Sequence, residues 1–136
     1  MFEILEHTAD IGFRAWGRSR EEMFENAALA LESVAVDVAE VEPLTPYPIA
    51  ASGEDEESLL VNWLSEVLFY LDGRRIAMRR FRVEQLTASE VAGQGWGEPR
   101  DAERPRSKLV VKGVTYHQLR ITRTGGGWSA EVYLDI

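Results

Sequence analysis

Residues 58–71 read SLLVNWLSEVLFYL, and this apolar stretch decides the fold. Its hydrophobic side chains recur three and four positions apart, which is the spacing of one buried helix face. Acidic residues fill positions 54–57, where they suit the positive end of a helix dipole, and Asp72-Gly73 follows as a helix-ending pair. The sequence therefore predicts a helix at the centre of the core. Its buried stripe comprises Leu59, Leu60, Trp63, Leu64, Val67, Leu68 and Leu71.

A second helix is predicted after Ser19, which forms a capping-box pattern with Glu22. Apolar residues then recur on one helix face from Met23 to Val34. Prolines at positions 43, 46 and 48 exclude a central strand in residues 41–50, because each lacks the backbone N–H that a ladder needs. That stretch is expected to be a loop or an edge.

The remaining periodic segments predict strands. They lie at residues 2–6, 11–16, 78–85, 108–111, 116–122 and 128–134, with a glycine turn at 125–127. Residues 93–106 are rich in glycine, proline and arginine, which predicts a mobile loop, and residues 93–97 lack the strand and helix that flank a phosphate loop. The expected fold is α+β: one domain over residues 1–136, with a mostly antiparallel sheet of about six strands and two main helices.

The composition limits the classes of partner. The chain has 136 residues and a formal net charge of −8, so its overall field repels polyanions and tight direct binding of nucleic acid is not expected. The arginines within residues 74–82 are interpreted as a solvated face. The absence of cysteine excludes disulfides and thiolate metal sites. With no secretion leader and no apolar run long enough for a membrane span, a soluble cytoplasmic protein is expected.

Carboxylates near the two ends of the chain form the candidate metal site. Asp10 lies in an expected turn, and the last predicted strand ends at Asp135-Ile136. If a sheet brings Asp10 beside the terminus, up to three carboxylates converge, and a cation between them would relieve their repulsion. Alternatively, Asp10 fixes a turn and Asp135 solvates a strand face. Oxygen donors of this kind favour calcium over magnesium, and the low histidine content argues against zinc.

A second group of polar residues lies near the start of the next-to-last predicted strand. Lys112, Thr115 and His117 fall within six positions. Alternation along a strand would place Lys112 on one face and His117 on the other. The group is either an ordinary hairpin strand, with a lysine that extends into solvent, or part of a functional site.

Four blocks of the chain together resemble the archease family. They are His7-Thr8-Ala9-Asp10-Ile11-Gly12-Phe13, residues 59–64, residues 112–117 and the terminal Leu134-Asp135-Ile136. The blocks stand in the family's order and reach both ends of the chain. Two departures stand out: Gly113, where the family more often has alanine, and the segment 93–106, where the family varies in length.

The resemblance implies an accessory protein, not itself an enzyme, that helps the RtcB-class tRNA-splicing RNA ligase to become guanylylated and to turn over repeatedly. Asp10, Asp135 and Ile136 match metal-binding positions, for which calcium is expected, and Lys112 matches a lysine needed for activation. His117 and His7 are further candidates for activating the partner. Two alternatives remain: a chaperone or modulator of tRNA-modifying enzymes such as methyltransferases, and a small hydrolase that uses the metal with His117.

Overall fold

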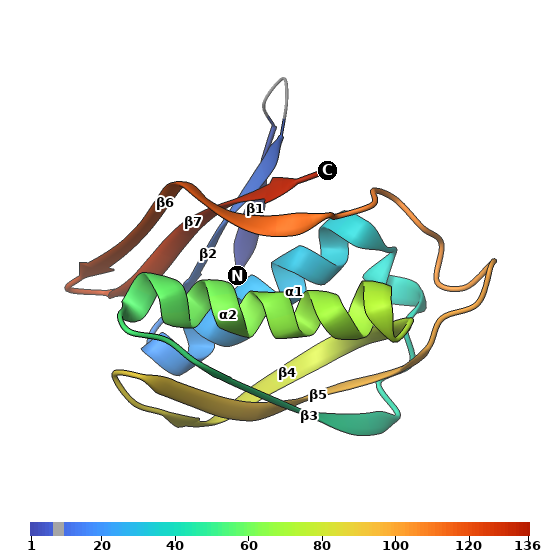
Figure 1. Cartoon of the computed structure of the whole chain (residues 1–136), viewed down its shortest axis with the longest axis horizontal. Helices are drawn as coiled ribbons and strands as arrows, with labels where there is room; N and C mark the ends of the chain where they lie inside the picture. Colours follow the sequence, from blue (N-terminus) through green and yellow to red (C-terminus); the bar gives the residue numbers. More distant parts are fainter. Residues whose placement is uncertain (7–9) are drawn as a thin grey trace.

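The computed structural model describes residues 1–6 and 10–136, and it places two helices between two antiparallel sheets (Figure 1). One sheet has the strand order β1-β2-β7-β6 and the other has the order β3-β5-β4. The predicted α+β class with two main helices is confirmed, and the strands, seven in the described part of the chain, are divided between two sheets. The strands are β1 (Phe2–Glu6), β2 (Ile11–Gly17), β3 (Thr45–Ser52), β4 (Ile76–Leu86), β5 (Glu90–Pro99), β6 (Gly113–Thr124) and β7 (Gly127–Asp135).

Both helices begin at capping residues that the sequence carries. Helix α1 (Arg20–Ala35) starts after Ser19, whose hydroxyl accepts a hydrogen bond from the Glu22 backbone N–H at 3.1 Å. Helix α2 (Glu56–Leu68) starts after Asp55, which forms a reciprocal capping box with Ser58. These bonds satisfy N–H groups that the first turn of a helix leaves unpaired. A π-helical turn, η2 (Phe69–Gly73), extends α2, and a short 3₁₀ turn, η1 (Val38–Glu40), follows α1.

The apolar stripe of α2 occupies the centre of the core, as predicted. Trp63 is fully buried, and its indole Nε1 donates to the Phe24 carbonyl oxygen of α1 at 3.0 Å. Helix α1 packs on β2 and β4, and α2 packs on β3 and β6, so each helix contacts both sheets. Of the predicted stripe, Leu59, Leu60, Trp63, Leu64, Val67 and Leu71 are buried and Leu68 is partly buried.

The proline-rich segment forms the edge strand β3, which agrees with the predicted loop or edge. Strand β3 pairs with β5 and lies at the edge of its sheet. Pro46 and Pro48 are two positions apart, so their nitrogens, which carry no hydrogen, lie on the same side of the strand. An edge tolerates this, because one side of the strand needs no ladder bonds.

The predicted mobile loop at residues 93–106 is wrong for residues 93–99, which belong to β5 in the middle of the three-stranded sheet. Strand β4 carries bulges between Met78 and Arg80 and between Val83 and Gln85. A Cβ atom on Gly93 would overlap the carbonyl oxygen of Arg82, and one on Gly97 would overlap that of Ala77. The glycines therefore permit close approach of an irregular neighbouring strand, which is a reason for glycine inside a strand.

The predicted strand at residues 108–111 is also wrong. This segment has no strand structure and lies beside the C-terminal end of α1, where the backbone N–H of Lys108 donates to the Ala35 carbonyl oxygen at 2.8 Å. The hairpin after it is confirmed: β6 and β7 pair around the glycine turn, although β6 is irregular between Thr115 and Arg120. None of the helices in the described residues has the length and apolar character that crossing a bilayer takes.

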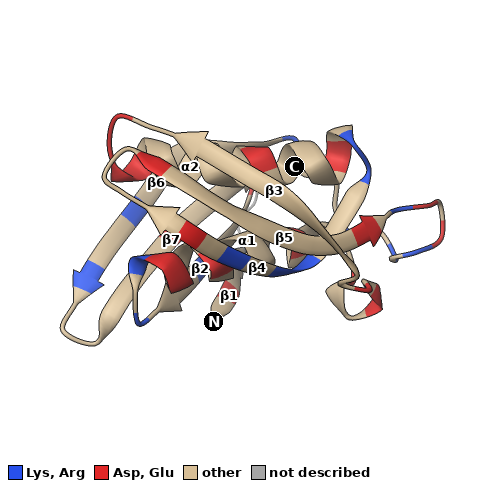
Figure 2. Ribbon diagram, turned by 90° about the horizontal axis from the view of Figure 1, so that it is seen from below, with Lys and Arg blue, Asp and Glu red and all other residues tan. Residues whose placement is uncertain are grey.

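The clustered arginines contact separate partners. Arg74 stacks on Tyr70, with its guanidinium 4.9 Å from the ring centroid, and Arg80 lies 4.7 Å from the ring of Trp96. Figure 2 shows basic and acidic residues interspersed over the elements that face the viewer. This pattern agrees with a solvated face for Arg74 and Arg80, whereas Arg75 of the same cluster lines a cavity.

Candidate functional site

Three neighbouring strands of the four-stranded sheet bring the predicted site residues to one end of that sheet. Ile11 at the start of β2 pairs with Leu134 near the end of β7, and Asp135 pairs with Gly113 at the start of β6. The register continued by one residue places Asp10 opposite Asp135. The backbone N–H of Lys112 donates to the carbonyl oxygen of Asp135 at 2.7 Å.

The two aspartates belong to the face of the sheet that points away from the helices. Ile11 and Leu134 are buried in the core, so the alternation of side chains directs Asp10 and Asp135 to the opposite face. Asp135 and Lys112 are exposed, Asp10 is partly exposed, and Ile136 is 42% exposed. The sheet end is therefore an exposed rim.

Tyr133 covers this face of the sheet beside the aspartates, and sequence reasoning missed it. Its ring lies over Gly12, where an added Cβ would stand 2.6 Å from the ring atom Cε1. Although it belongs to the outer face, Tyr133 is only 4% exposed. Burial raises the pKa of its hydroxyl, and the negative charges of Glu131 and Asp10 raise this pKa further. The sequence feature that could have indicated it is Gly12, two residues after Asp10, because a glycine leaves room for a large side chain on the neighbouring strand.

His117 lies near the same end of the sheet, on the irregular part of β6. Its ring centroid is 6.4 Å from that of Tyr133, in an edge-to-face arrangement. Its backbone N–H donates to the Thr115 hydroxyl oxygen at 3.3 Å, and that hydroxyl donates to the Tyr133 carbonyl oxygen at 3.1 Å. The structure thus brings Asp10, Lys112, His117, Asp135 and Ile136 to one region. The remaining candidate, His7, lies outside the described residues.

The charges of the site residues are not paired within the described part of the chain. No ion pair there joins Asp10 or Asp135 to a basic side chain, and the Lys112 ammonium has no hydrogen-bond partner among those residues. The described residues hold no group of three or more histidine, aspartate or glutamate side chains arranged for a metal. Two aspartates and a main-chain oxygen of Ile136 are nevertheless a donor set that suits a hard divalent cation.

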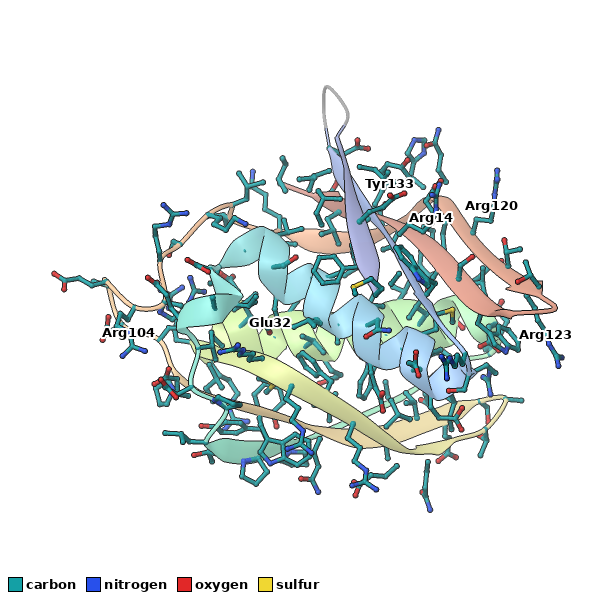
Figure 3. All side chains as sticks on the ribbon, turned by 180° about the vertical axis from the view of Figure 1, so that it is seen from behind. Arg14, Glu32, Arg104, Arg120, Arg123 and Tyr133 are labelled. Carbon is teal, nitrogen blue, oxygen red and sulfur yellow. The ribbon has the colours of Figure 1, made fainter. Side chains whose placement is uncertain are left out.

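Farther along the same face, the acidic residues are paired with arginine. Arg14 of β2 donates to the Glu3 carboxylate at 2.6 Å and to the Glu131 carboxylate at 3.2 Å. Arg120 stands opposite Glu131 in the register of β6 and β7. Figure 3 shows Arg14, Arg120 and Tyr133 beside one another on three strands. The sheet end differs from this region, because its aspartates have no basic partner among the described residues.

The packing of Tyr133 on Gly12 leads to a testable prediction. We expect Gly12→Val to lower the free energy of unfolding by about 1–3 kcal/mol, because the new side chain displaces the tyrosine ring. Thr122→Val, on the exposed part of the same face, is the control and is expected to change stability by less than about 0.5 kcal/mol. Urea denaturation of the three proteins measures both effects. Equal stability of Gly12→Val and the parent would contradict the packing.

Comparisons with known proteins agree over the full length of the chain. The model of the Archease protein family (MTH1598/TM1083) matches residues 2–136. An archease of Methanosarcina barkeri is 42% identical over 139 residues, which cover 99% of this chain and 95% of that protein. An archease of Sulfurisphaera tokodaii is 38% identical and covers 99% and 98% of the two chains.

Solved structures show the same fold. The solution structure of a Methanobacterium thermoautotrophicum protein superimposes with a TM-score of 0.85 at 37% identity, covering 99% of this chain and 98% of that one. A crystal structure of an archease from Thermotoga maritima gives a TM-score of 0.69 at 21% identity, covering 97% of this chain and 94% of that one. The second likeness supports the fold alone.

Proposed function

The chain belongs to the archease family, and on that premise we propose that it activates an RNA ligase of the RtcB class. In this role it promotes guanylylation of the ligase and its repeated turnover in tRNA splicing and RNA repair. The ligase carries out the catalysis and binds the RNA. The net charge of −8 suits such a division, because an accessory protein that acts on the enzyme has no need to bind a polyanion. The proposed place of action is the cytoplasm.

One observation supports the proposal most directly. Asp135 and Lys112 carry side-chain charges of opposite sign that are unpaired within the described residues, and both lie on an exposed rim. Their backbones are joined by a hydrogen bond of 2.7 Å. Exposed and unpaired charged groups contribute little to stability, so their gathering at one sheet end is better explained by a partner or a ligand.

A divalent cation is part of the proposal. Asp10, Asp135 and a main-chain oxygen of Ile136 would hold it, and the oxygen donors and the exposed position favour calcium. When bound, the cation supplies positive charge at the surface that meets the partner. Lys112 adds a mobile positive charge beside it, which can orient a phosphate or a carboxylate of the ligase.

The exposure of the site favours an activator over a small hydrolase. A hydrolytic site encloses its substrate in a concave pocket beside the metal. Asp135, Lys112 and His117 are instead exposed. A surface of this kind is suited to contact with another macromolecule, and the alternative role as a modulator of tRNA-modifying enzymes shares that property. The two roles differ in the partner that responds.

The experiment measures guanylylation and multiple-turnover joining by a purified cognate ligase, with and without this protein. We expect the parent to stimulate both reactions and Lys112→Ala to lose most of the stimulation. Lys112 is exposed and its ammonium makes no hydrogen bond in the described residues, so the variant should keep its stability within about 0.5 kcal/mol. Arg82→Ala removes an exposed positive charge on the other sheet and serves as the matched control.

Full stimulation by Lys112→Ala would remove the role assigned to this lysine. No stimulation by the parent, tested with several ligases, would favour the modulator of tRNA-modifying enzymes. The same proteins would then be assayed with tRNA methyltransferases.

A further inference from the structure

A cavity of about 230 Å³ lies where the C-terminal ends of α1 and α2 meet the segment 107–111, which directly precedes Lys112. Its lining combines charged residues with an apolar part. Arg75, Arg100, Lys108 and Asp72 are the charged residues. The apolar part includes Leu109 and Val110, which are 40% and 69% exposed.

Arg100 forms the inner part of this cavity. Two of its guanidinium nitrogens donate to the protein: Nη1 to the Leu71 carbonyl oxygen and Nη2 to the Ser107 hydroxyl, both at 3.1 Å. Its Nε atom is buried and has no partner among the described residues. Burial lowers the pKa of the guanidinium, and the nearby positive charge of Arg75 lowers this pKa further. The bonds to Leu71 and Ser107 hold the guanidinium in place, so its position is set before any ligand binds.

The cavity concentrates positive charge in a protein whose net charge is −8. Three basic side chains line it against one acid, Asp72, so an excess of two positive charges remains. The Lys108 ammonium is held over the end of α1 by a 3.0 Å hydrogen bond to the Ser33 carbonyl oxygen. Arg75 is fixed differently: its backbone has a φ of 59°, and its carbonyl oxygen accepts a 2.7 Å bond from the Arg100 N–H.

Glu32 lies behind Arg100 and does not cancel this charge at neutral pH. Glu32 belongs to α1 (Figure 3). Its side chain is completely buried, and burial raises its pKa to about 8. At pH 7 the carboxyl is therefore mostly protonated, and the positive charge of Arg100 remains available to a ligand.

We propose that this cavity binds a small phosphate monoester that carries an apolar group. A phosphate monoester has a charge of about −1.5 to −2 at pH 7, which matches the excess of positive charge better than a carboxylate does. Arginine guanidinium groups and a lysine ammonium are the usual partners of phosphate oxygens. The apolar group would lie against Leu109 and Val110, which are otherwise exposed.

The test is an NMR titration of the ¹⁵N-labelled full chain with phenyl phosphate, inorganic phosphate and benzoate at constant ionic strength and pH 7. We expect saturable shifts of the backbone amides of residues 100 and 107–111 with phenyl phosphate. Inorganic phosphate and benzoate should each bind about tenfold more weakly, since one lacks the apolar contact and the other lacks the second charge.

Two variants leave Arg100, which is bonded to Leu71 and Ser107, unchanged and so keep the fold. Arg75→Asn retains a residue type that tolerates positive φ, and Lys108→Gln removes the ammonium. We expect each to weaken phenyl phosphate binding about tenfold or more. Arg82→Gln is the control, because it removes one positive charge elsewhere.

Shifts spread over basic residues throughout the chain, or equal weakening by Arg82→Gln and Lys108→Gln, would overturn the site. Equal affinity for phenyl phosphate and inorganic phosphate would overturn the apolar part of the proposal. These outcomes are independent of the ligase assay, which reports on the sheet end.

Discussion

Asp135→Asn is expected to abolish stimulation of the ligase and to weaken calcium binding by roughly two orders of magnitude, because the number of charged ligands sets calcium affinity. Asparagine has nearly the same shape, so the end of β7 should be preserved. The hydrogen bond from Lys112 N–H uses the backbone oxygen of Asp135 and does not depend on its side chain. The loss would therefore be one of charge rather than of fold. Asp10→Asn is expected to act in the same way.

Isothermal titration with calcium, followed by the ligase assay, measures both effects. Glu54→Gln removes an exposed carboxylate far along the chain from the sheet end and is the matched control. Thermal melting without metal checks the fold. Calcium affinity of both aspartate variants equal to that of the parent would contradict the metal site. If their affinity fell while ligase stimulation stayed complete, the cation would have no part in activation.

Local periodicity was sufficient to predict the helices. The stripe around Trp63 and the cap at Ser19 are properties of residues close in sequence, and both are present in the structure. Residues 93–99 of β5 were missed because their glycines resemble a loop when read locally. Glycine is needed at positions 93 and 97 because carbonyl oxygens of β4, next to its bulges, occupy the space that a Cβ atom would take. Sequence periodicity contains no information about such a contact between strands.

In the candidate site, too, some residues could be predicted from the sequence and others depend on contacts between distant segments. Asp10, Lys112 and Asp135 were chosen from the chain ends and from the family resemblance, and the strand register brings their backbones to one sheet end. Tyr133 was not chosen, because alternation assigns it to an outer face where burial is not expected. The cavity around Arg100 was also missed. Its lining comes from segments that are distant in sequence, and no motif connects them.

The buried carboxyl of Glu32 leads to a second large expected effect, on the pH dependence of stability. Its Oε1 atom accepts a hydrogen bond from the Met78 N–H at 3.1 Å, while Oε2 is buried and has no partner in the described residues. Burial raises the pKa of this carboxyl to about 8, although the bond from Met78 and the charge of Arg100 both act to lower it. The protonated form is therefore the one that the folded protein accommodates.

Between the ordinary pKa of a glutamate and a pH of about 8, the unfolded chain has released this proton while the folded chain still holds it. The unfolded state then binds fewer protons, so the free energy of unfolding falls as the pH rises, by up to about 1.4 kcal/mol per pH unit. Above a pH of about 8 both states have lost the proton, and this contribution becomes constant.

Glu32→Gln is expected to remove this contribution. The glutamine carbonyl oxygen can still accept the bond from Met78 N–H, and the side chain has no proton to lose. The stability of the variant relative to the parent should therefore increase by a few kcal/mol between pH 5 and pH 8.5. Urea denaturation at pH 5, 7 and 8.5 measures this difference, and other titrating groups cancel because both proteins contain them. A difference that stays constant across this range would show that Glu32 ionises in the folded protein as it does in the unfolded chain.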